Sequence, residues 1–381
     1  MRATFDSREV KPGMTFVALK GEKADGHDFI PQALANGAAR IIDGYAELDA
    51  AAKEKRAALS AKVIAVTGSA GKTTTKELLK AFFSRLGKTH ATEGNFNNHI
   101  GLPLTILNCP DDAEFLILEM GTNHPGEIQH LCEIASPDVG IITNIGTAHL
   151  EFFGSREAIA KEKGTLLAAA KEFGIVSSEC YGLDVMPAER RIEVNPRNEE
   201  IADAVAAVLP GDHNISNASL AFAAAQKFGL TAAEASKALA GFQLPGARWR
   251  KYEWLGVTYI DDSYNANPES MIAALDAFAK EECYGKHIVC LADMLELGEN
   301  SAELHRKVFQ HAKDLNFFVI GIGPIACKSP SHYQLFDTDH LRRILPNTVK
   351  TGDIVLLKGS HSWNLTSALP FGLRLELGMV K

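Results

Sequence analysis

The sequence lacks the features that mark secreted and membrane proteins. Its six cysteines are scattered and include no Cys-x-x-Cys pair, which predicts reduced, mostly buried thiols rather than a disulfide framework. No apolar run approaches the length of a membrane span, and the opening Met-Arg-Ala-Thr-Phe-Asp-Ser-Arg has no apolar segment typical of a signal peptide. We therefore expect a cytoplasmic protein.

Basic charge is also scarce. The net charge at pH 7 is −8 and no long basic run occurs, so binding to nucleic acid is not expected. The composition is otherwise ordinary for a globular protein, with 46% hydrophobic and 23% charged residues and no evident internal repeat. A chain of 381 residues predicts roughly two or three domains, each able to bury its own core.

The stretch from residue 63 to residue 80 predicts a phosphate-binding loop. A β-branched run ending at Val66 indicates a buried strand, Gly68 and Gly71 allow a tight turn, and a helix is expected from Lys72. Backbone N–H groups at such a helix N-terminus favour an anion, and the threonines that follow Gly-Lys can ligate Mg²⁺. The alternative is an ordinary turn with a solvated lysine. The generic motif has an earlier glycine in place of Val66, so the match is to a shorter variant, and we favour binding of ATP or GTP. The residues predicted to bind the nucleotide here are Gly68, Ser69, Ala70, Gly71, Lys72, Thr73 and Thr74.

An asparagine-rich loop follows. Asn95, Asn97 and Asn98 stand among glycines, and asparagine side chains are costly to bury unless they are hydrogen-bonded. They could be ordinary loop residues with no binding role, but we favour a hydrogen-bonding site beside the phosphates.

Two further side chains stand at the ends of expected strands. Glu119 ends the apolar strand 115–119, and a carboxylate at the carboxyl end of a parallel strand is well placed to hold the Mg²⁺ of a nucleotide. His149 follows the strand 139–144; a lone histidine is more often structural, but this position makes it a candidate metal ligand. The lysines of the expected helix 159–166 indicate a solvated face when taken by themselves.

Alternating strands and helices predict an α/β fold. We expect a small first unit at residues 1–60, a central unit at 61–245 and a last unit at 246–381 with a second parallel sheet. Expected strands are 16–19, 39–43, 63–66, 115–119, 139–144, 257–260, 287–291, 317–320 and 354–357. Expected helices are 30–36, 48–61, 72–86, 159–166, 217–228, 269–280 and 302–312.

Several motifs together resemble the Mur ligases, the ATP-dependent amide-bond-forming enzymes of peptidoglycan synthesis. The resemblance covers nearly the whole chain. Asp293 to Gly298, the asparagine-rich loop and the Asp-Ser-Arg opening favour the member that adds D-alanyl-D-alanine to UDP-N-acetylmuramoyl-tripeptide. The motifs that carry the resemblance are residues 67–73, 94–98, 118–121, 144–151 and 261–268.

The resemblance implies three domains: a UDP-binding N-terminal domain, a central P-loop ATPase domain and a C-terminal Rossmann-like domain. It also implies that ATP phosphorylates the terminal carboxylate of the tripeptide. The amine of D-alanyl-D-alanine then attacks the acyl phosphate, and the products are UDP-N-acetylmuramoyl-pentapeptide, ADP and phosphate. We expect a monomer that binds neither nucleic acid nor a membrane.

The same resemblance implies residue roles. Thr73 and Glu119 would ligate a first Mg²⁺ and His149 a second, and Lys163 would be a carbamylated lysine ligand, with Lys161 as the fallback. Lys72 and Arg248 would offset the repulsion between carboxylate and γ-phosphate. Asn214 and Asp262 would hold adenine and ribose. The residues expected near UDP are Ser7, Arg8, Asp25, Gly26 and His27, and the remaining substrate-binding residues are Asn95, Asn97, Asn98, Asn265, Asn267 and Lys358.

Three departures from the family pattern stand out. The chain begins almost at Asp-Ser-Arg, the stretch between Gly174 and His213 looks shortened, and His361 stands where relatives commonly have arginine. The first departure concerns the binding of uridine. The last concerns the docking of the dipeptide, because the permanently charged guanidinium of arginine is replaced by a titratable imidazole.

Two alternatives remain. One is another amide ligase of the superfamily, such as a different Mur step, a folylpolyglutamate synthase or a cyanophycin-type enzyme; the N-terminal unit argues against the folate reading. The other is a non-catalytic nucleotide-binding relative, and the complete set of phosphate and metal residues argues against it.

Overall fold

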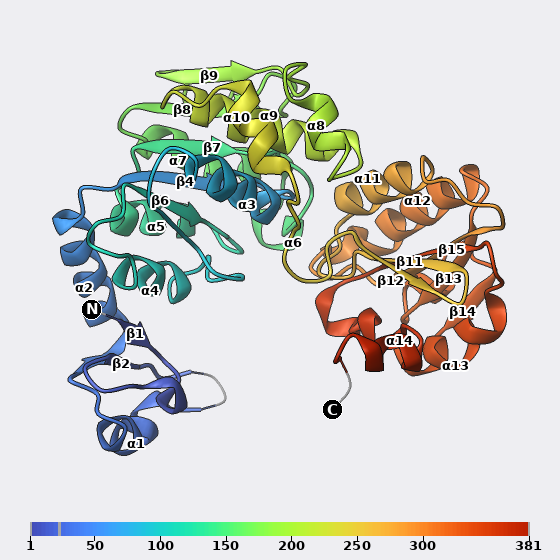
Figure 1. Cartoon of the computed structure of the whole chain (residues 1–381), viewed down its shortest axis with the longest axis horizontal. Helices are drawn as coiled ribbons and strands as arrows, with labels where there is room; N and C mark the ends of the chain where they lie inside the picture. Colours follow the sequence, from blue (N-terminus) through green and yellow to red (C-terminus); the bar gives the residue numbers. More distant parts are fainter. Residues whose placement is uncertain (1, 22–23, 380–381) are drawn as a thin grey trace. The chain divides into compact units, whose positions relative to one another are not determined.

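The computed structural model describes residues 2–21 and 24–379, so Glu22 and Lys23 of the polar loop in the first unit lie outside the described residues. The chain forms two compact units (Figure 1). The first contains residues 1–145, 157–204 and 216–241, and the second contains residues 146–156, 205–215 and 242–381. Within the described residues, no helix has both the length and the apolarity needed to cross a membrane.

The first unit begins with a small parallel sheet. Its strands are β1 (Ala3–Thr4), β2 (Thr15–Ala18) and β3 (Arg40–Asp43), in the order β1-β2-β3. The 3-10 helices Ser7–Glu9 and Gly26–Phe29 and helix α1 (Ile30–Ala35) connect them. Helix α2 (Gly44–Ala58) leads to the next sheet and begins four residues before the predicted start.

The main sheet of the first unit has six parallel strands in the order β5-β6-β4-β7-β8-β9. Because β4 pairs with β6 on one side and β7 on the other, the strand order reverses at β4, which is where open sheets bind ligands. The pairing of Val66 with Glu119 and of Thr67 with Ile142 brings the carboxyl ends of these three strands to one edge. The strands are β4 (Lys62–Thr67), β5 (Thr89–Ala91), β6 (Phe115–Glu119), β7 (Val139–Ile142), β8 (Phe173–Ser177) and β9 (Arg191–Val194).

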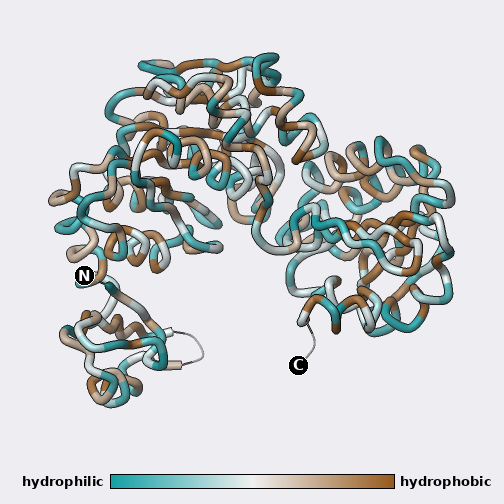
Figure 2. The backbone as a smooth tube through the Cα atoms, viewed as in Figure 1, coloured by the Kyte–Doolittle hydropathy of each residue, from teal (hydrophilic) through white to brown (hydrophobic). Residues whose placement is uncertain are grey.

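Helices cover both faces of this sheet. On one face, α2, α4 (Gly101–Leu107) and α5 (Glu127–Ala135) pack on Val63 and Ala65 of β4 (Figure 1). Adjacent residues of a strand point to opposite faces, so the other face of the sheet also needs a cover. On that face, α3 (Lys72–Phe83) and α9 (Asp212–Gln226) contact each other through the rings of Phe82 and Phe222. Figure 2 shows how hydrophobic residues follow the strands. The other helices are α7 (Arg156–Ala169), α8 (Ala202–Ala206) and α10 (Ala232–Leu239).

The second unit is built on a six-stranded sheet in the order β10-β11-β15-β12-β13-β14. All neighbours are parallel except β10 and β11, which form an antiparallel pair that the sequence pattern did not predict. The strands are β10 (Arg250–Trp254), β11 (Val257–Asp261), β12 (His287–Ala292), β13 (Phe318–Ile322), β14 (Tyr333–Leu335) and β15 (Ile354–Lys358).

This sheet also has two cores. Val289 and Leu291 of β12 face a cluster formed with α11 (Pro268–Phe278) and α12 (Ser301–Asp314). The alternate residues Ile288 and Cys290 face a second cluster, to which α13 (Thr338–Thr348) and α14 (Phe371–Glu376) contribute. The prediction of an α/β fold is therefore confirmed. The helix expected at 72–86 ends at Phe83, and the helix expected from 217 begins at Asp212.

Candidate active site

The glycines of the phosphate-binding loop are required by close contacts. A Cβ added at Gly68 would lie 1.8 Å from Thr143 Oγ1, and one added at Gly71 would lie 2.4 Å from Asn217 Oδ1. Gly71 also has a φ of +79°, and it immediately precedes the first residue of α3, a conformation that glycine adopts without strain. The loop therefore passes tightly between β7 and α9 before the helix begins.

The end of β7 holds this loop in place. Asn144 accepts hydrogen bonds from the backbone N–H of Ala70 through Oδ1 (2.9 Å) and from that of Ser69 through its carbonyl (3.1 Å). Thr143 Oγ1 donates to the carbonyl of Ala70 at 2.5 Å. Lys72 Nζ donates to the carbonyl of Gly68 at 2.8 Å, which places a positive charge over the loop. The cradle is therefore preformed, and Asn144 and Thr143 support it in a way that the sequence pattern did not reveal.

Glu119 has an unusual environment beside this loop. The residue is only 2% exposed, and its Oε1 accepts a hydrogen bond from Asn97 Nδ2 at 2.8 Å. Among the described residues, its Oε2 is buried with no hydrogen-bond partner. A buried carboxylate oxygen without a partner is costly, and a divalent cation bound there would remove that cost. Glu119 therefore fits the predicted role of a Mg²⁺ ligand.

The asparagine-rich loop lies against Glu119. The carbonyl of Asn97 accepts from the backbone N–H of Gly121 at 2.8 Å, so the loop is fixed at both its side chain and its backbone. Asn98 Oδ1 accepts from the backbone N–H groups of Ile100 and Gly101 at the start of α4. The third member, Asn95, is exposed. Asn97 thus positions Glu119, and Asn98 shapes the loop itself.

Lys163 is the most perturbed lysine of the site. It lies on α7 and is 1% exposed; burial, and secondarily the charge of Lys72, lowers its pKa to about 7. Its ammonium makes no hydrogen bond or ion pair to any described residue. An amine with this pKa is largely neutral near pH 8, and only a neutral amine can attack CO₂ to form a carbamate. Lys161, in contrast, is 61% exposed and pairs with Glu157 at 2.7 Å. The structure therefore places Lys163 in the interior and Lys161 at the surface.

His149 belongs to the second unit. Its Nδ1 lies 2.6 Å from Glu296 Oε2, and both residues have positive φ angles, +63° and +62°. The same segment is held by Glu269, whose Oε1 accepts from the backbone N–H and the hydroxyl of Thr147 at 2.7 and 2.9 Å. Strained residues of this kind persist where the surrounding structure fixes them. The segment that carries His149 is therefore fixed by Glu269, and the imidazole lies next to the Glu296 carboxylate.

Arg248 stacks on an aromatic ring. Its guanidinium carbon lies 3.4 Å from the centre of the Tyr264 ring, and Nη1 donates to the carbonyl of Pro245 at 3.0 Å. The ring of His361 lies 5.6 Å from that of Tyr264. A cation–π contact of this kind holds the guanidinium over the face of the ring.

Lys358 fixes the loop that follows β11. It is 4% exposed, and its Nζ donates to Asp262 Oδ2 at 2.7 Å and to the carbonyls of Asp262 and Asn265 at 3.3 and 3.2 Å. Asn267 caps α11, its side chain accepting from the backbone N–H of Ser270 at 2.8 Å. In this structure Lys358 and Asn267 therefore shape the loop on which Asp262 and Asn265 are presented.

Asn214 and the residues predicted near UDP make local contacts. Asn214 Nδ2 donates to the carbonyl of Pro210 at 2.7 Å. Ser7 Oγ donates to Gln32 Oε1 at 2.5 Å, and the exposed Arg8 pairs with Asp6 at 2.6 Å.

His27 is held between two carboxylates of the first small sheet. It contacts Asp25 through Nδ1 and Asp43 through Nε2, the latter at 2.8 Å. The hydrogen bond to Asp25, followed by that to Asp43, raises the pKa of His27. Gly26 lies in the same turn, where an added Cβ would be 2.6 Å from the backbone nitrogen of Leu19. Asp25, Gly26 and His27 therefore form one tight turn, and their place near UDP stays a prediction.

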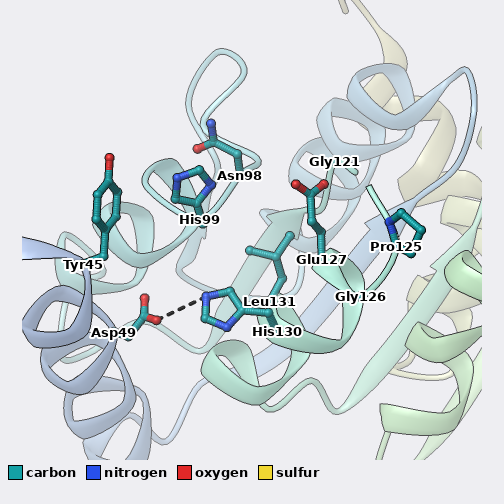
Figure 3. Close-up of a pocket in the computed structure, with 10 residues that line it drawn as sticks. All are labelled: Tyr45, Asp49, Asn98, His99, Gly121, Pro125, Gly126, Glu127, His130 and Leu131. Atoms are coloured by element: carbon teal, nitrogen blue, oxygen red, sulfur yellow. Dashed lines mark ion pairs between the residues drawn. The ribbon is translucent and has the colours of Figure 1, made fainter. Parts of the chain in front are cut away.

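A cavity of about 470 Å³ lies beside the carboxyl end of β6 (Figure 3). It is formed by α2, the asparagine-rich loop, the segment after β6 and α5. The sequence pattern predicted a binding role for Asn98 alone among its lining residues, because most of the others come from separate elements with no shared motif. The lining residues are Tyr45, Asp49, Asn98, His99, Gly121, Pro125, Gly126, Glu127, His130 and Leu131.

Comparison with known families gives three matches along the chain. The model described as Mur ligase family, catalytic domain, matches residues 3–82; the Mur ligase middle domain matches residues 66–181; and the Mur ligase, glutamate ligase domain, matches residues 248–361. Together these matches span most of the chain.

Individual relatives and solved structures agree. The UDP-N-acetylmuramoyl-tripeptide–D-alanyl-D-alanine ligase of Bacillus subtilis is 33% identical, with 94% of this chain and 90% of that protein covered. The ligase of the same name from Escherichia coli is 34% identical, with 81% and 78% covered. The crystal structure of MurF ligase from Thermotoga maritima in complex with ADP has a TM-score of 0.83 at 30% identity, with 100% and 98% covered. MurF from Acinetobacter baumannii has a TM-score of 0.86 at 28% identity, with 97% and 92% covered.

Proposed function

The chain belongs to the Mur ligase family, and we propose that it is the ligase that adds D-alanyl-D-alanine to UDP-N-acetylmuramoyl-tripeptide. The observation that carries the proposal is a match over 94% of the chain and 90% of the relative to an enzyme of that name. The preformed phosphate loop supports it from the structure, and so does the Glu119 oxygen that has no hydrogen-bond partner in the described part of the chain, since both suit a nucleotide with its metal ion.

The proposed reaction has two steps. A carboxylate oxygen of the tripeptide attacks the γ-phosphorus of ATP, the bond to the bridging oxygen breaks, and ADP leaves. The neutral amine of D-alanyl-D-alanine then attacks the acyl carbon, and phosphate leaves as the amide forms. Two anions must approach each other in the first step, so positive charge at this place lowers the barrier.

The phosphate-binding loop supplies part of that charge. We assign the phosphates to the loop of residues 68–74, with the backbone N–H groups of residues 71–74 at the start of α3 and the Lys72 ammonium, which already lies over the loop, as the donors. Asn144 keeps the loop in shape by accepting from the backbone N–H groups of Ser69 and Ala70, so little reorganisation is needed when the nucleotide binds. Arg248 is assigned to the γ-phosphate by the family resemblance.

The proposed metal ligands are Thr73 and Glu119 for a first Mg²⁺, and carbamylated Lys163 and His149 for a second. Mg²⁺ bound to these groups would reduce the repulsion between carboxylate and phosphate. The residues fit this role, because Glu119 offers a buried oxygen that has no hydrogen-bond partner among the described residues, and burial lowers the pKa of Lys163 to about 7, so that a substantial share of this amine is neutral near physiological pH. Asn97 holds Glu119 in place by donating to its other oxygen at 2.8 Å.

The remaining assignments follow the family resemblance. We propose that Asn214 and Asp262 hold adenine and ribose, and that the turn around His27 lies near UDP. The proposed domains are residues 1–60, 61–245 and 246–381, each containing one of the three sheets. We further propose a cytoplasmic monomer, because ATP and UDP-linked precursors are cytoplasmic metabolites.

The test is phosphate release from Mg-ATP in the presence of UDP-N-acetylmuramoyl-tripeptide, with and without D-alanyl-D-alanine. We expect release only when both are present, with UDP-N-acetylmuramoyl-pentapeptide identified by mass spectrometry. Lys72→Ala should abolish release, whereas Lys80→Ala, which removes an exposed charge from the same helix, should not.

The controls are shorter UDP-muramoyl precursors and single amino acids. Release with one of these instead would assign the chain to another amide ligase of the superfamily. Absence of release with every pair, together with measurable ATP binding, would favour a non-catalytic nucleotide-binding relative.

A further inference from the structure

Lys76 is a buried lysine that the proposed mechanism does not use. It lies on α3, and its side chain is 0% exposed. Its Nζ donates to the carbonyl of Thr92 at 2.8 Å and forms an ion pair with Glu77 Oε1 at 2.7 Å. Burial of an ammonium group is costly even when it is paired, and an apolar side chain of similar size would avoid that cost. The ammonium group therefore needs an explanation beyond packing.

Thr92 connects Lys76 to Glu119. It directly follows β5 and is 2% exposed. Its backbone N–H donates to the carbonyl of Ile117 at 2.9 Å, and its Oγ1 accepts from the backbone N–H of Glu119 at 3.0 Å. Glu119 is therefore held through its backbone by Thr92 and through its carboxylate by Asn97.

Lys76 is also tied to the phosphate-binding loop. It lies three residues after Thr73 in α3, so the two side chains leave the helix on the same side. Helix α3 begins immediately after the loop and packs against both β5 and β6. The hydrogen bond from Lys76 to Thr92 therefore joins the helix that carries Thr73 to the segment that holds Glu119. Thr73 and Glu119 are the two proposed ligands of the first Mg²⁺.

We propose that Lys76 is a positioning residue for the first Mg²⁺ site. Acting through Thr92, it fixes the separation between Thr73 and Glu119. It thereby keeps Glu119 Oε2, which has no hydrogen-bond partner among the described residues, where a cation can bind. Lys76 is not itself a ligand. The proposal rests on the proposed function, because that function supplies the Mg²⁺ and the roles of its two ligands.

ATP binding with and without Mg²⁺ tests this role without turnover. Isothermal titration calorimetry measures the dissociation constant of ATP in excess Mg²⁺ and again in EDTA, and the ratio of the two reports the contribution of the metal site. Lys76→Met keeps a long side chain and removes the donor. Loss of a group that orients a metal ligand costs about 10–100-fold in metal affinity, so this ratio should shrink about tenfold or more. The dissociation constant in EDTA should stay close to that of the unchanged protein.

Thr92 offers a matched pair of variants. Thr92→Val keeps the shape of the side chain and removes Oγ1, so the backbone N–H of Glu119 loses its acceptor and the ratio should shrink as in Lys76→Met. Thr92→Ser retains the oxygen and should keep the ratio of the unchanged protein. The double variant Lys76→Met/Thr92→Val should lose no more than the larger single loss, because both changes break the same connection. Lys80→Met, at an exposed position of α3, should change neither constant.

Stability is separated from positioning by a second variant. Removal of Lys76 alone leaves the Glu77 carboxylate, which is 18% exposed, without its cation, and such a change can unfold a protein. Lys76→Met/Glu77→Gln removes both charges and avoids that penalty, so it should fold and show the same reduced ratio. Equal weakening of ATP binding in Mg²⁺ and in EDTA would show a merely structural role and would overturn the proposal. An unchanged ratio in the Lys76 variants would overturn it too.

Failure of the proposed function gives a different result. If phosphate release never requires D-alanyl-D-alanine, the ligase assignment is wrong, but the Mg²⁺ dependence of ATP binding still decides the role of Lys76. If release requires both substrates and the ratio is unchanged in Lys76→Met, the ligase assignment stands and Lys76 does not position the metal site.

Discussion

Lys163 is the residue whose environment departs furthest from that of a surface lysine. The sequence alone indicated a solvated face for its helix, and only the family resemblance distinguished it from its neighbours. The structure supplies the physical distinction, because Lys163 is buried and close enough to Lys72 for the two charges to repel, whereas Lys161 is paired at the surface. Helical periodicity over a short amphipathic segment could not decide which lysine faces inward.

The carbamate hypothesis gives the first prediction. Lys163→Ala should reduce ligation at least 100-fold, because a metal-ligating carboxylate is lost. Acetate supplied in solution should partly restore activity by providing a carboxylate at the vacated place. Lys161→Ala is the control and should retain activity. Steady-state phosphate release measures both, and full activity of Lys163→Ala would exclude a role for the carbamate.

The lowered pKa of Lys163 also predicts how stability depends on pH. Its pKa falls from 10.5 in the unfolded chain to about 7 in the folded protein, so the folded state binds fewer protons between these values. The free energy of unfolding should therefore rise with pH from about 7 to about 10.5. Urea unfolding in CO₂-free buffer, compared with Lys163→Met, measures this contribution. A difference between the two proteins that is independent of pH would contradict the prediction.

At the scale of elements, the phosphate-binding loop was predictable because its signal is local. Strand, glycines and helix follow one another directly, and each residue type has a conformational reason to be there. The supports of the loop were not predictable in the same way, since Asn144 and Asn217 reach it from β7 and α9. The antiparallel strand β10 was also missed, because its residues are charged or aromatic, Arg-Lys-Tyr-Glu-Trp, and form no apolar run.

Replacement of the loop glycines provides a third prediction. Gly71→Ala places a methyl group 2.4 Å from Asn217 Oδ1 at a positive φ, and we expect it to weaken ATP binding more than tenfold. The left-handed conformation itself costs about 1–2 kcal/mol for a residue with a Cβ.

Gly229→Ala is a control that separates the backbone strain of a positive φ from the steric contact with Asn217. Gly229 has a φ of +96°, and an added Cβ there meets no atom within 4 Å. The Gly229→Ala variant should have a free energy of unfolding lowered by about as much as that of Gly71→Ala, measured by chemical unfolding. Its affinity for ATP, measured by calorimetry, should be normal. Similar ATP affinity in the two variants would show that the contact with Asn217 is unimportant.

At the scale of the whole molecule, the phosphate-binding loop and the cavity beside β6 lie in the same compact unit. The sequence motifs predicted the loop, but the cavity requires α2, the asparagine-rich loop and α5 to pack together. Such a site is formed by tertiary structure, so no contiguous pattern of residues identifies it. Lys72 lies in the loop and not in the lining of the cavity, so loss of its charge should affect the loop and leave the cavity unchanged.

Ligand-dependent stability tests this separation in the intact protein. A ligand that binds only the folded state at 100 times its dissociation constant stabilises that state by about 2.7 kcal/mol, which raises the melting temperature. In Lys72→Ala, Mg-ATP should no longer raise the melting temperature, whereas UDP-N-acetylmuramoyl-tripeptide still should. Differential scanning fluorimetry of the full chain measures both, and a variant that loses both responses together would show that the two sites are not independent.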